Sequence, residues 1–361
     1  MGIRIGLDYS WFLIFALITW LMAGSYYPSE FTGWPHALYW ILGVATAILL
    51  FVSVVLHELG HSAVALRYKI PVHDITLFLF GGVSQIEAEP PNARAEFLIA
   101  IAGPVISLIL AGIFTVLKPA FTSSQPVWAL VQYLAYINFA LAIFNLIPGY
   151  PLDGGRVLRA SVWAITKNLR RATLIAANTG RFFGLLFIFF GVMMIFRGDF
   201  GNGIWIAFIG WFLDSAAARE VHQAMFQGML AGHTVQQAMG HPCPAISSEM
   251  ALQQLVDEHI LGTGNRCFLV EQAGQTIGLI TLGRVREIPR ENWPATRIGE
   301  AMVPLDQMKH TEPKSEVWSA LEEMERDGVN QLPVMTDHQV VGMLSRDDVI
   351  TFLGTMKELG G

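Results

Sequence analysis

Long runs of residues without a formal charge constrain this chain most strongly. A membrane-spanning helix needs about 20 consecutive, mainly apolar residues, and four such runs occur in the first half of the chain. Two shorter apolar runs follow, so about six spans are expected. The six runs lie between Asp8 and Glu30, from Phe31 to His57, and over residues 97–117, 127–149, 182–196 and 200–213. A polytopic α-helical membrane domain is therefore predicted.

Charge is distributed unevenly between the two halves of the chain. Residues 1–225 carry 13 Lys or Arg and 11 Asp or Glu, whereas residues 226–361 carry 10 and 18. We therefore expect a membrane domain over residues 1–222, a linker over residues 223–233, and a soluble acidic region beyond it. No stretch rich in Lys and Arg offers a face for phosphates, so nucleic acid is not an expected partner.

The basic residues near the ends of the spans predict the orientation in the membrane. With the N-terminus inside, eleven of the thirteen basic residues of the first half fall on the cytoplasmic side, and Lys118 and Arg197 fall outside. Cytoplasmic loops carry an excess of such residues. The chain is thus predicted to be a multi-pass protein of the cell membrane, with its N-terminus and its soluble region in the cytoplasm. There Cys243 and Cys267 are expected to be reduced thiols.

The second apolar run ends in the sequence HELGH. His57 and His61 are four residues apart, so on a helix they stand on one face, where two imidazoles can bind one Zn²⁺. Glu58 lies beside them and can reach a water molecule at the metal. The alternative is a pair of core histidines that hydrogen-bond to neighbouring carbonyl groups. Ionisable groups inside a membrane are rare and usually functional, which favours the metal site.

A third ligand is offered by the sequence NLIPGYPLDGGR, which follows the fourth span. Asp153 is the only acidic residue between Glu96 and Asp199. The prolines and glycines around Asp153 break the helix, and broken backbone at membrane depth is tolerated where it lines a cavity or is buried in protein. The alternative is a simple Asp-Gly turn at the membrane interface. Both motifs approach the cytoplasmic side, so Asp153 is expected to lie near HELGH.

Together the two motifs resemble those of the site-2 protease family of intramembrane zinc metalloproteases. The resemblance covers roughly residues 1–220, and it is specific because both motifs occur at the expected places. The residues that match the second motif position by position are Asn145, Pro148, Leu152, Asp153 and Gly154.

This resemblance implies both a chemistry and a substrate. One zinc ion per chain would be held by His57, His61 and Asp153, with Glu58 as the general base and Asn145 near the substrate or the oxyanion. The enzyme would hydrolyse a peptide bond in or near a transmembrane segment of a membrane-protein substrate. By family analogy that substrate is a single-span regulator of transcription, such as an anti-sigma factor or a pro-sigma factor.

The segment ITLFLFGGVSQIEAEPP, between the second and third spans, is predicted to be a β-hairpin. A substrate must be extended, because a helix hides its carbonyl groups in internal hydrogen bonds. The hairpin carries Gly81 and Gly82 and would offer a strand edge for β-augmentation. A hairpin in the corresponding region of the family agrees with this role, and the alternative is a role in packing only.

Residues 234–290 and 297–355 look like two copies of one unit, in which RIGEAM echoes TVQQAM and VWSALEEM echoes ALQQLVDE. Each copy is predicted to run strand, helix, two strands and helix, which makes a soluble α/β module. The pattern resembles a tandem pair of cystathionine-β-synthase-type (CBS) domains. The resemblance implies binding of ATP, AMP or another adenosyl ligand at Ser345 and Asp348. Arg284 replaces that Asp in the first copy, so at most one nucleotide site is expected.

Two functions are compatible with these features. One is an intramembrane zinc protease that is regulated by adenine-nucleotide binding to the CBS pair. The alternative is a CBS-regulated membrane transporter or channel without protease activity. Glu58 distinguishes them, because a transporter needs ion ligands but no general base. In either case the CBS pair could serve only as a scaffold, or as the contact through which two chains form a homodimer.

Overall fold

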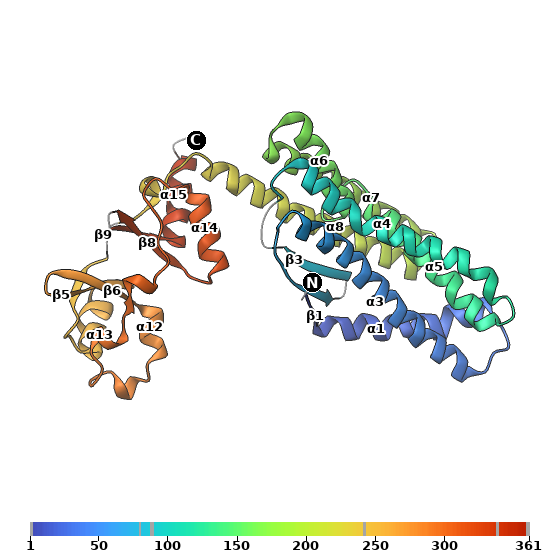
Figure 1. Ribbon diagram of the computed structural model, residues 1–361, viewed down its shortest axis with the longest axis horizontal. Helices are drawn as coiled ribbons and strands as arrows, with labels where there is room; N and C mark the ends of the chain where they lie inside the picture. The colour runs from blue at the N-terminus through green and yellow to red at the C-terminus, as the bar shows by residue number, and fades with distance from the viewer. Residues whose placement is uncertain (1–2, 79–80, 87–89, 241–242, 337–338, 359–361) are drawn as a thin grey trace. The chain divides into compact units, whose positions relative to one another are not determined.

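The computed structural model divides into two units, Met1–Ala224 and Met225–Gly361 (Figure 1). It describes residues 3–78, 81–86, 90–240, 243–336 and 339–358.

The first unit is a bundle of long helices with a small sheet beside them (Figure 1). Among the residues that the structure describes, five helical segments of this unit are long and apolar enough to cross a membrane, which confirms the polytopic membrane domain. They are Tyr9–Glu30, composed of α1 (Tyr9–Leu21), η1 (Met22–Tyr26) and α2 (Tyr27–Glu30); α3 (His36–Arg67); Ala93–Phe121, composed of α4 (Ala93–Leu117) and η2 (Lys118–Phe121); α5 (Gln125–Asn145); and α7 (Leu169–Phe196).

The sixth expected span falls on α8 (Phe200–Leu230), which is 31 residues long but is not one of these five segments. Polar Asn202 and charged Asp214 interrupt its apolar stretch. The same helix continues through residues 223–230, where the sequence predicts part of a linker. The last residue of α8 is fully buried in the core of the second unit.

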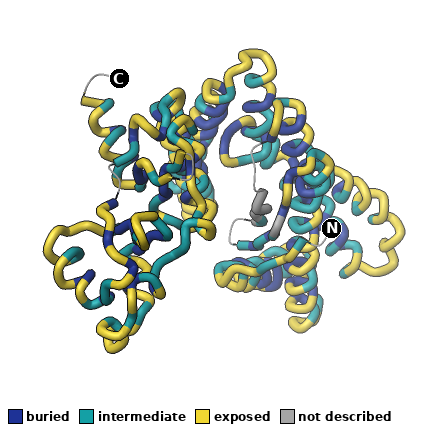
Figure 2. The backbone as a smooth tube through the Cα atoms, turned by 60° about the vertical axis from the view of Figure 1, so that its left-hand side comes forward, coloured by how far each residue is buried: buried dark blue, intermediate teal, exposed yellow. Residues whose placement is uncertain are grey.

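Polar residues begin three helices of the first unit, and small residues lie where its helices meet. The side chains of Asp8, Asn92 and Asn168 accept backbone hydrogen bonds at the starts of α1, α4 and α7. Alanines and glycines are buried between the helices, whereas many large apolar side chains are exposed. Figure 2 shows exposed stretches of backbone along these helices. Such extensive apolar exposure is typical of a surface that faces lipid.

The small sheet of the first unit contains β1 (Arg4–Leu7), β2 (Val72–Phe78) and β3 (Gly81–Ile86), in that order. β1 is parallel to β2, and β2 and β3 form the antiparallel hairpin that the sequence predicts. Leu77 of β2 packs against Ile14 and Phe51, which attaches the sheet to α1 and α3. Among the strands that the structure describes, β3 lies at an edge of the sheet.

The second unit contains the two predicted α/β halves. The first half has a four-stranded sheet of order β4-β5-β6-β7, and the second half pairs β8 with β9. The first half contains β4 (Ala245–Ser247), α10 (Leu252–Gln254), η3 (Leu255–Ile260), α11 (Leu261–Thr263), β5 (Cys267–Gln272), β6 (Gln275–Thr281) and α12 (Leu282–Glu287). The second contains α14 (Val317–Arg326), β8 (Gln331–Thr336), β9 (Gln339–Ser345) and α15 (Arg346–Glu358). Between α12 and α14 the chain forms η4 (Arg290–Asn292), α13 (Ile298–Ala301), β7 (Val303–Pro304), which completes the sheet of the first half, and η5 (Leu305–Gln307).

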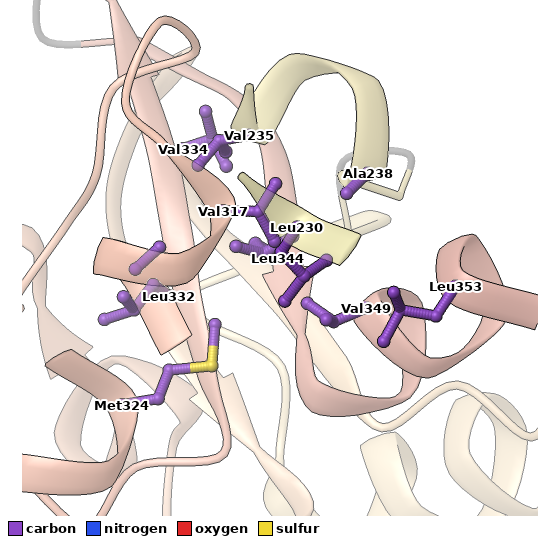
Figure 3. Close-up of a cluster of buried hydrophobic side chains, with 11 residues drawn as sticks. Leu230, Val235, Ala238, Val317, Met324, Leu332, Val334, Leu344, Val349 and Leu353 are labelled. Carbon is purple, nitrogen blue, oxygen red and sulfur yellow. The ribbon is translucent and has the colours of Figure 1, made fainter. Parts of the chain in front are cut away.

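The chain that enters the second unit packs against its second half rather than its first. Leu230 and α9 (Val235–Ala238) lie in one buried cluster with Val317, Leu344 and Leu353 (Figure 3). The start of the first copy therefore completes the core of the second half, and Ile298 and Ala301 at the start of the second copy lie in the core of the first half. This exchange makes the two halves one folding unit.

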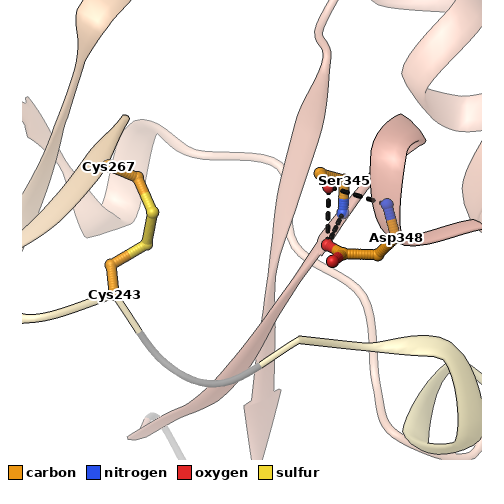
Figure 4. The surroundings of a disulfide bond; sticks show 4 residues. All are labelled: Cys243, Cys267, Ser345 and Asp348. Atoms are coloured by element: carbon orange, nitrogen blue, oxygen red, sulfur yellow. Dashed lines mark hydrogen bonds between the residues drawn. A yellow bond between two sulfur atoms is a disulfide. The ribbon is translucent and has the colours of Figure 1, made fainter. Parts of the chain in front are cut away.

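The prediction of reduced thiols is wrong, because Cys243 and Cys267 form a disulfide (Figure 4). β4 pairs in parallel with β5, and their register places Ala245 opposite Leu269. Cys243 is two residues before Ala245, and Cys267 is two residues before Leu269. The same register therefore places the two cysteines side by side, with their Cα atoms 5.6 Å apart. That distance is typical of a disulfide. The pairing depends on strand register, which the spacing of two cysteines does not reveal.

Candidate metal centre

Three potential metal ligands meet where α3 and the start of α6 (Asp153–Thr166) approach each other. The Oδ2 atom of Asp153 lies 3.1 Å from Nε2 of His57 and 3.1 Å from Nε2 of His61. The two Nε2 atoms are 3.2 Å apart. Both histidines are 4% exposed, and the Asp153 side chain is 14% exposed. The structure therefore brings together the three residues that the two motifs single out.

The other nitrogen of each imidazole is held by α4. The Nδ1 atom of His61 donates to the carbonyl oxygen of Ile99 at 2.7 Å, and Nδ1 of His57 lies 2.9 Å from Oγ of Ser107. An imidazole whose Nδ1 carries the proton presents the lone pair of Nε2 to its other side. Such outer partners fix the tautomer and orientation of metal-binding histidines. The sequence alone identifies neither Ile99 nor Ser107.

Two glycines allow α3 and α4 to approach closely at this point. A Cβ atom at Gly103 would overlap Nε2 of His61 and Nε2 of His57. On α3, a Cβ atom at Gly60 of HELGH would lie 2.8 Å from Cγ1 of Ile106. The sequence AIAGP at residues 100–104 already indicates close helix packing. It does not indicate that Gly103 lies against both imidazoles.

The glycines after Asp153 place its helix against the preceding loop. α5 ends at Asn145 and α6 begins at Asp153, so residues 146–152 connect them without a helix. A Cβ atom at Gly154 would collide with the carbonyl oxygens of residues 146 and 147, and one at Gly155 with the backbone of residues 149 and 150. The first turn of α6 therefore fits only with glycine at these positions, and it carries Asp153 to the cluster.

Glu58 lies beside the cluster on α3, and β3 passes over it. A Cβ atom at Gly82 would be 2.6 Å from Cγ of Glu58 and 3.3 Å from its Oε1. Gly81 pairs with Phe78 and begins the same strand. Asn145 is half-buried at the C-terminal end of α5. The strand that carries both glycines is thus next to the predicted general base.

The donor set of the cluster suits zinc. Two neutral imidazoles and a carboxylate are typical ligands of catalytic Zn²⁺, which needs three protein ligands and an open position. The ligand atoms lie within 4.8 Å of one another. Two nitrogen lone pairs and a carboxylate oxygen repel one another at such distances unless a cation or a proton lies between them. The residues present therefore fit a zinc ion.

Ser345 and Asp348 form a capping box at the start of α15 (Figure 4). Oδ2 of Asp348 accepts from the backbone N–H of Ser345 at 2.9 Å and from its hydroxyl at 2.6 Å, while Oγ of Ser345 accepts from the N–H of Asp348. In the first half, Thr281 caps α12 by accepting from the N–H of Arg284. Arg284 lacks a carboxylate, so that cap is not reciprocal.

A cleft of about 890 Å³ in the second unit borders both of these helix starts. Ser345 lies in its wall, whereas Asp348 is not among its described wall residues. The acidic residues of the wall are Glu287, Asp327 and Asp347. The basic residues of the wall are Arg266, Arg284, Arg286, Lys309 and Arg346. The excess of basic residues favours an anionic ligand.

Comparisons with known proteins agree with the geometry of both units. The family model described as Peptidase family M50 matches residues 45–124 and 116–189, and the CBS domain model matches residues 301–355. The chain is 36% identical to a Synechocystis protein named as a zinc metalloprotease, sll0528, over 98% of this chain and 94% of that one. It is 32% identical to Rip3 of Mycobacterium tuberculosis, also named as a zinc metalloprotease, over 96% and 90%.

Among solved structures, the site-2 protease from Methanocaldococcus jannaschii matches with a TM-score of 0.44 and 32% identity, over 61% of this chain and 92% of that one. The family match and the nearly full-length relatives decide the assignment. The chain belongs to peptidase family M50, the site-2 protease family of zinc metalloproteases, and carries a pair of CBS domains at its C-terminal end.

Proposed function

We propose that this protein hydrolyses a peptide bond in or near a transmembrane segment of a membrane-protein substrate. The observation that carries the proposal is the buried cluster of His57, His61 and Asp153 inside a bundle of membrane-spanning helices. These three residues are proposed to hold one zinc ion. When bound, zinc supplies a Lewis acid for the scissile carbonyl and for the attacking water.

Glu58 is proposed to be the general base. It lies next to His57 on α3, on the side of the cluster that β3 covers. A carboxylate there can take a proton from the attacking water and pass it to the leaving amine. The hydrogen bonds that Nδ1 of His57 and Nδ1 of His61 make with α4 hold both imidazoles in place while the proton moves.

The edge of β3 is proposed to bind the substrate as an added strand. Backbone groups of Gly81 and Gly82 would pair with an extended substrate segment and hold it over Glu58. A side chain at Gly82 would enter the space of Glu58, which explains glycine at this position. Asn145 is proposed to help position the substrate or the oxyanion from the end of α5. The distribution of basic residues supports a cytoplasmic location for this region.

Nearly full-length relatives named as zinc metalloproteases leave the alternative of a transporter or channel without support. By analogy with the family, the substrate is proposed to be a single-span anti-sigma factor or pro-sigma factor. The CBS pair is proposed to lie in the cytoplasm and to join two chains.

Removal of the metal tests the proposed chemistry. Purified protein in detergent is incubated with a set of single-span transmembrane peptides, and the products are identified by mass spectrometry. A zinc chelator is expected to abolish cleavage, and stoichiometric Zn²⁺ is expected to restore it. Mg²⁺ serves as the control, because it prefers oxygen ligands and should not restore cleavage. Cleavage that persists after complete zinc removal would contradict the proposal.

Adenine-nucleotide binding to the CBS pair is proposed as the regulatory input. The excess of basic residues in the cleft supports binding of the phosphates, and Ser345 borders the same space. ATP or AMP is expected to release or absorb heat on mixing with the full-length protein in a calorimeter. An Arg346→Ala variant should bind about tenfold more weakly, because a hydrogen bond to a charged group is lost.

Lys357→Ala supplies the control for this measurement. Lys357 is exposed on the same helix, near its other end, and is not a wall residue of the cleft. Its replacement should leave nucleotide binding unchanged. No heat with either nucleotide at millimolar concentration would mean that the CBS pair is a scaffold only.

A further inference from the structure

A buried ion pair joins α4 and α6 outside the cluster of metal ligands. The guanidinium group of Arg159 on α6 donates to the carboxylate of Glu96 on α4. The Glu96 side chain is fully buried, and that of Arg159 is 10% exposed. Moving two charged groups from water into the protein interior is costly. Well-packed apolar residues of similar size often stabilise a fold at least as much as a buried ion pair does. A role other than stability is therefore worth seeking for this pair.

Glu96 lies on the face of α4 that organises the cluster. Ile99, Gly103 and Ser107 follow it at intervals of three, four and four residues, which places all four on one side of the helix. The carbonyl oxygen of Ile99 accepts from His61, and Ser107 contacts His57. The ion pair and the partners of both imidazoles thus belong to one helix face.

The ion pair joins α4 and α6 directly, and the cluster joins the same two helices through the imidazoles of α3, at a second position along their axes. Arg159 is six residues after Asp153, about 9 Å along α6, and Gly103 is seven residues after Glu96, about 10 Å along α4. Asp153 meets the imidazoles where Gly103 lies against them, and Arg159 meets Glu96. The two helices are therefore antiparallel here, and the spacing of the two contacts matches on both. Two such contacts determine where α6 lies along the axis of α4 and how α6 is rotated about its own axis.

Arg159 also contacts the loop that precedes Asp153. Its guanidinium carbon lies 5.5 Å from the centre of the Tyr150 ring, within the range of a cation–π interaction. The backbone N–H of Tyr150 donates to the carbonyl oxygen of Ala176 on α7 at 3.2 Å. Arg159 therefore contacts both the loop that precedes Asp153, at Tyr150, and the neighbouring helix α4, at Glu96.

We propose that Glu96 and Arg159 are positioning residues for the metal centre. The pair sets α6 against α4 so that the carboxylate of Asp153 meets His57 and His61 in a geometry that binds zinc. This inference rests on the proposed function, since it assumes that these three residues hold the metal. Glu96 and Arg159 act through Asp153 and the α4 face, and their effect is on metal affinity.

The test measures zinc affinity by competition with a chromophoric chelator, using full-length protein in detergent. Arg159→Met is expected to weaken zinc binding about tenfold, at the lower end of the effect of removing outer partners of metal ligands. Arg159→Lys keeps the charge and should recover part of the affinity. The control is Arg181→Met, which removes the ion pair at 3.1 Å between Arg181 of α7 and Asp214 of α8. That control should bind zinc like the wild type.

A double variant, Glu96→Gln with Arg159→Met, keeps the test decisive if loss of the Arg159 guanidinium beside Glu96 prevents folding. It removes both charges, so its thermal unfolding should resemble that of the wild type while its zinc affinity stays low. A purely structural pair would show the reverse, with unfolding altered and the affinity of the folded protein unchanged. Wild-type zinc affinity in the folded double variant would overturn the positioning role. Failure of the wild type itself to bind zinc would instead overturn the proposed function.

Discussion

Replacing Glu58 by glutamine is expected to lower kcat/KM for peptide cleavage by about 10²–10⁴-fold, which is the usual contribution of a general acid–base group. Glutamine has nearly the same shape but cannot take a proton from water at neutral pH. Zinc content is expected to stay unchanged, because Glu58 is not one of the three residues whose ligand atoms meet. Cleavage of transmembrane peptides by the purified variant and its zinc content together test this prediction.

Glu30→Gln is the matched control for this substitution. Glu30 is exposed at the end of α2, within another membrane-spanning segment, so its replacement should leave cleavage unchanged. If Glu58→Gln keeps more than half of the wild-type kcat/KM, another group is the base, and the proposed role of Glu58 is wrong.

Gly103→Ala is expected to disrupt the proposed metal centre without replacing any of its three ligands. The added methyl group would overlap Nε2 of both His57 and His61, so the two imidazoles must move apart. We expect zinc affinity to fall about 10- to 100-fold and the free energy of unfolding to fall by about 1–3 kcal/mol from overpacking. Metal titration and thermal unfolding of the detergent-purified protein measure the two effects separately.

Gly112→Ala on the same helix supplies the control. A Cβ atom at Gly112 meets nothing within 4 Å, so alanine there should preserve zinc affinity. It should also stabilise α4 by about 0.5–1 kcal/mol, because glycine is a poor helix former. Equal zinc affinities in the Gly103→Ala and Gly112→Ala variants would mean that the imidazoles do not bind metal in the orientation described.

The three proposed metal ligands can be identified from the sequence because they lie in short motifs with a chemical meaning. His57 and His61 follow the spacing of a helix, and Asp153 is conspicuous as a lone acidic residue after the fourth span. The contacts that orient these side chains cannot be identified in this way. The Ile99 carbonyl is a backbone group, and Gly103 becomes informative only once α4 is packed against α3.

Strand pairing and helix caps explain the remaining differences. Cys243 and Cys267 become neighbours only through the parallel register of β4 and β5. The motif that contains Ser345 and Asp348 suggests a contact with an adenosyl ligand by resemblance. In the structure the same spacing of three residues serves a helix cap, and the Asp348 carboxylate is bound to Ser345. The spacing of Ser345 and Asp348 can thus be explained by the cap of α15, whether or not a ligand binds.

The most direct test of the central proposal is the zinc content of protein purified without chelators, for the wild type and for His57→Ala, Asp153→Ala and Asp199→Ala. We expect about one zinc ion per chain in the wild type and in the Asp199→Ala control, and almost none in the other two variants. That result would show that HELGH and the distant aspartate form one site. A wild type that stays empty after zinc is resupplied, or an Asp153→Ala variant that keeps its full zinc content and affinity, would contradict the account.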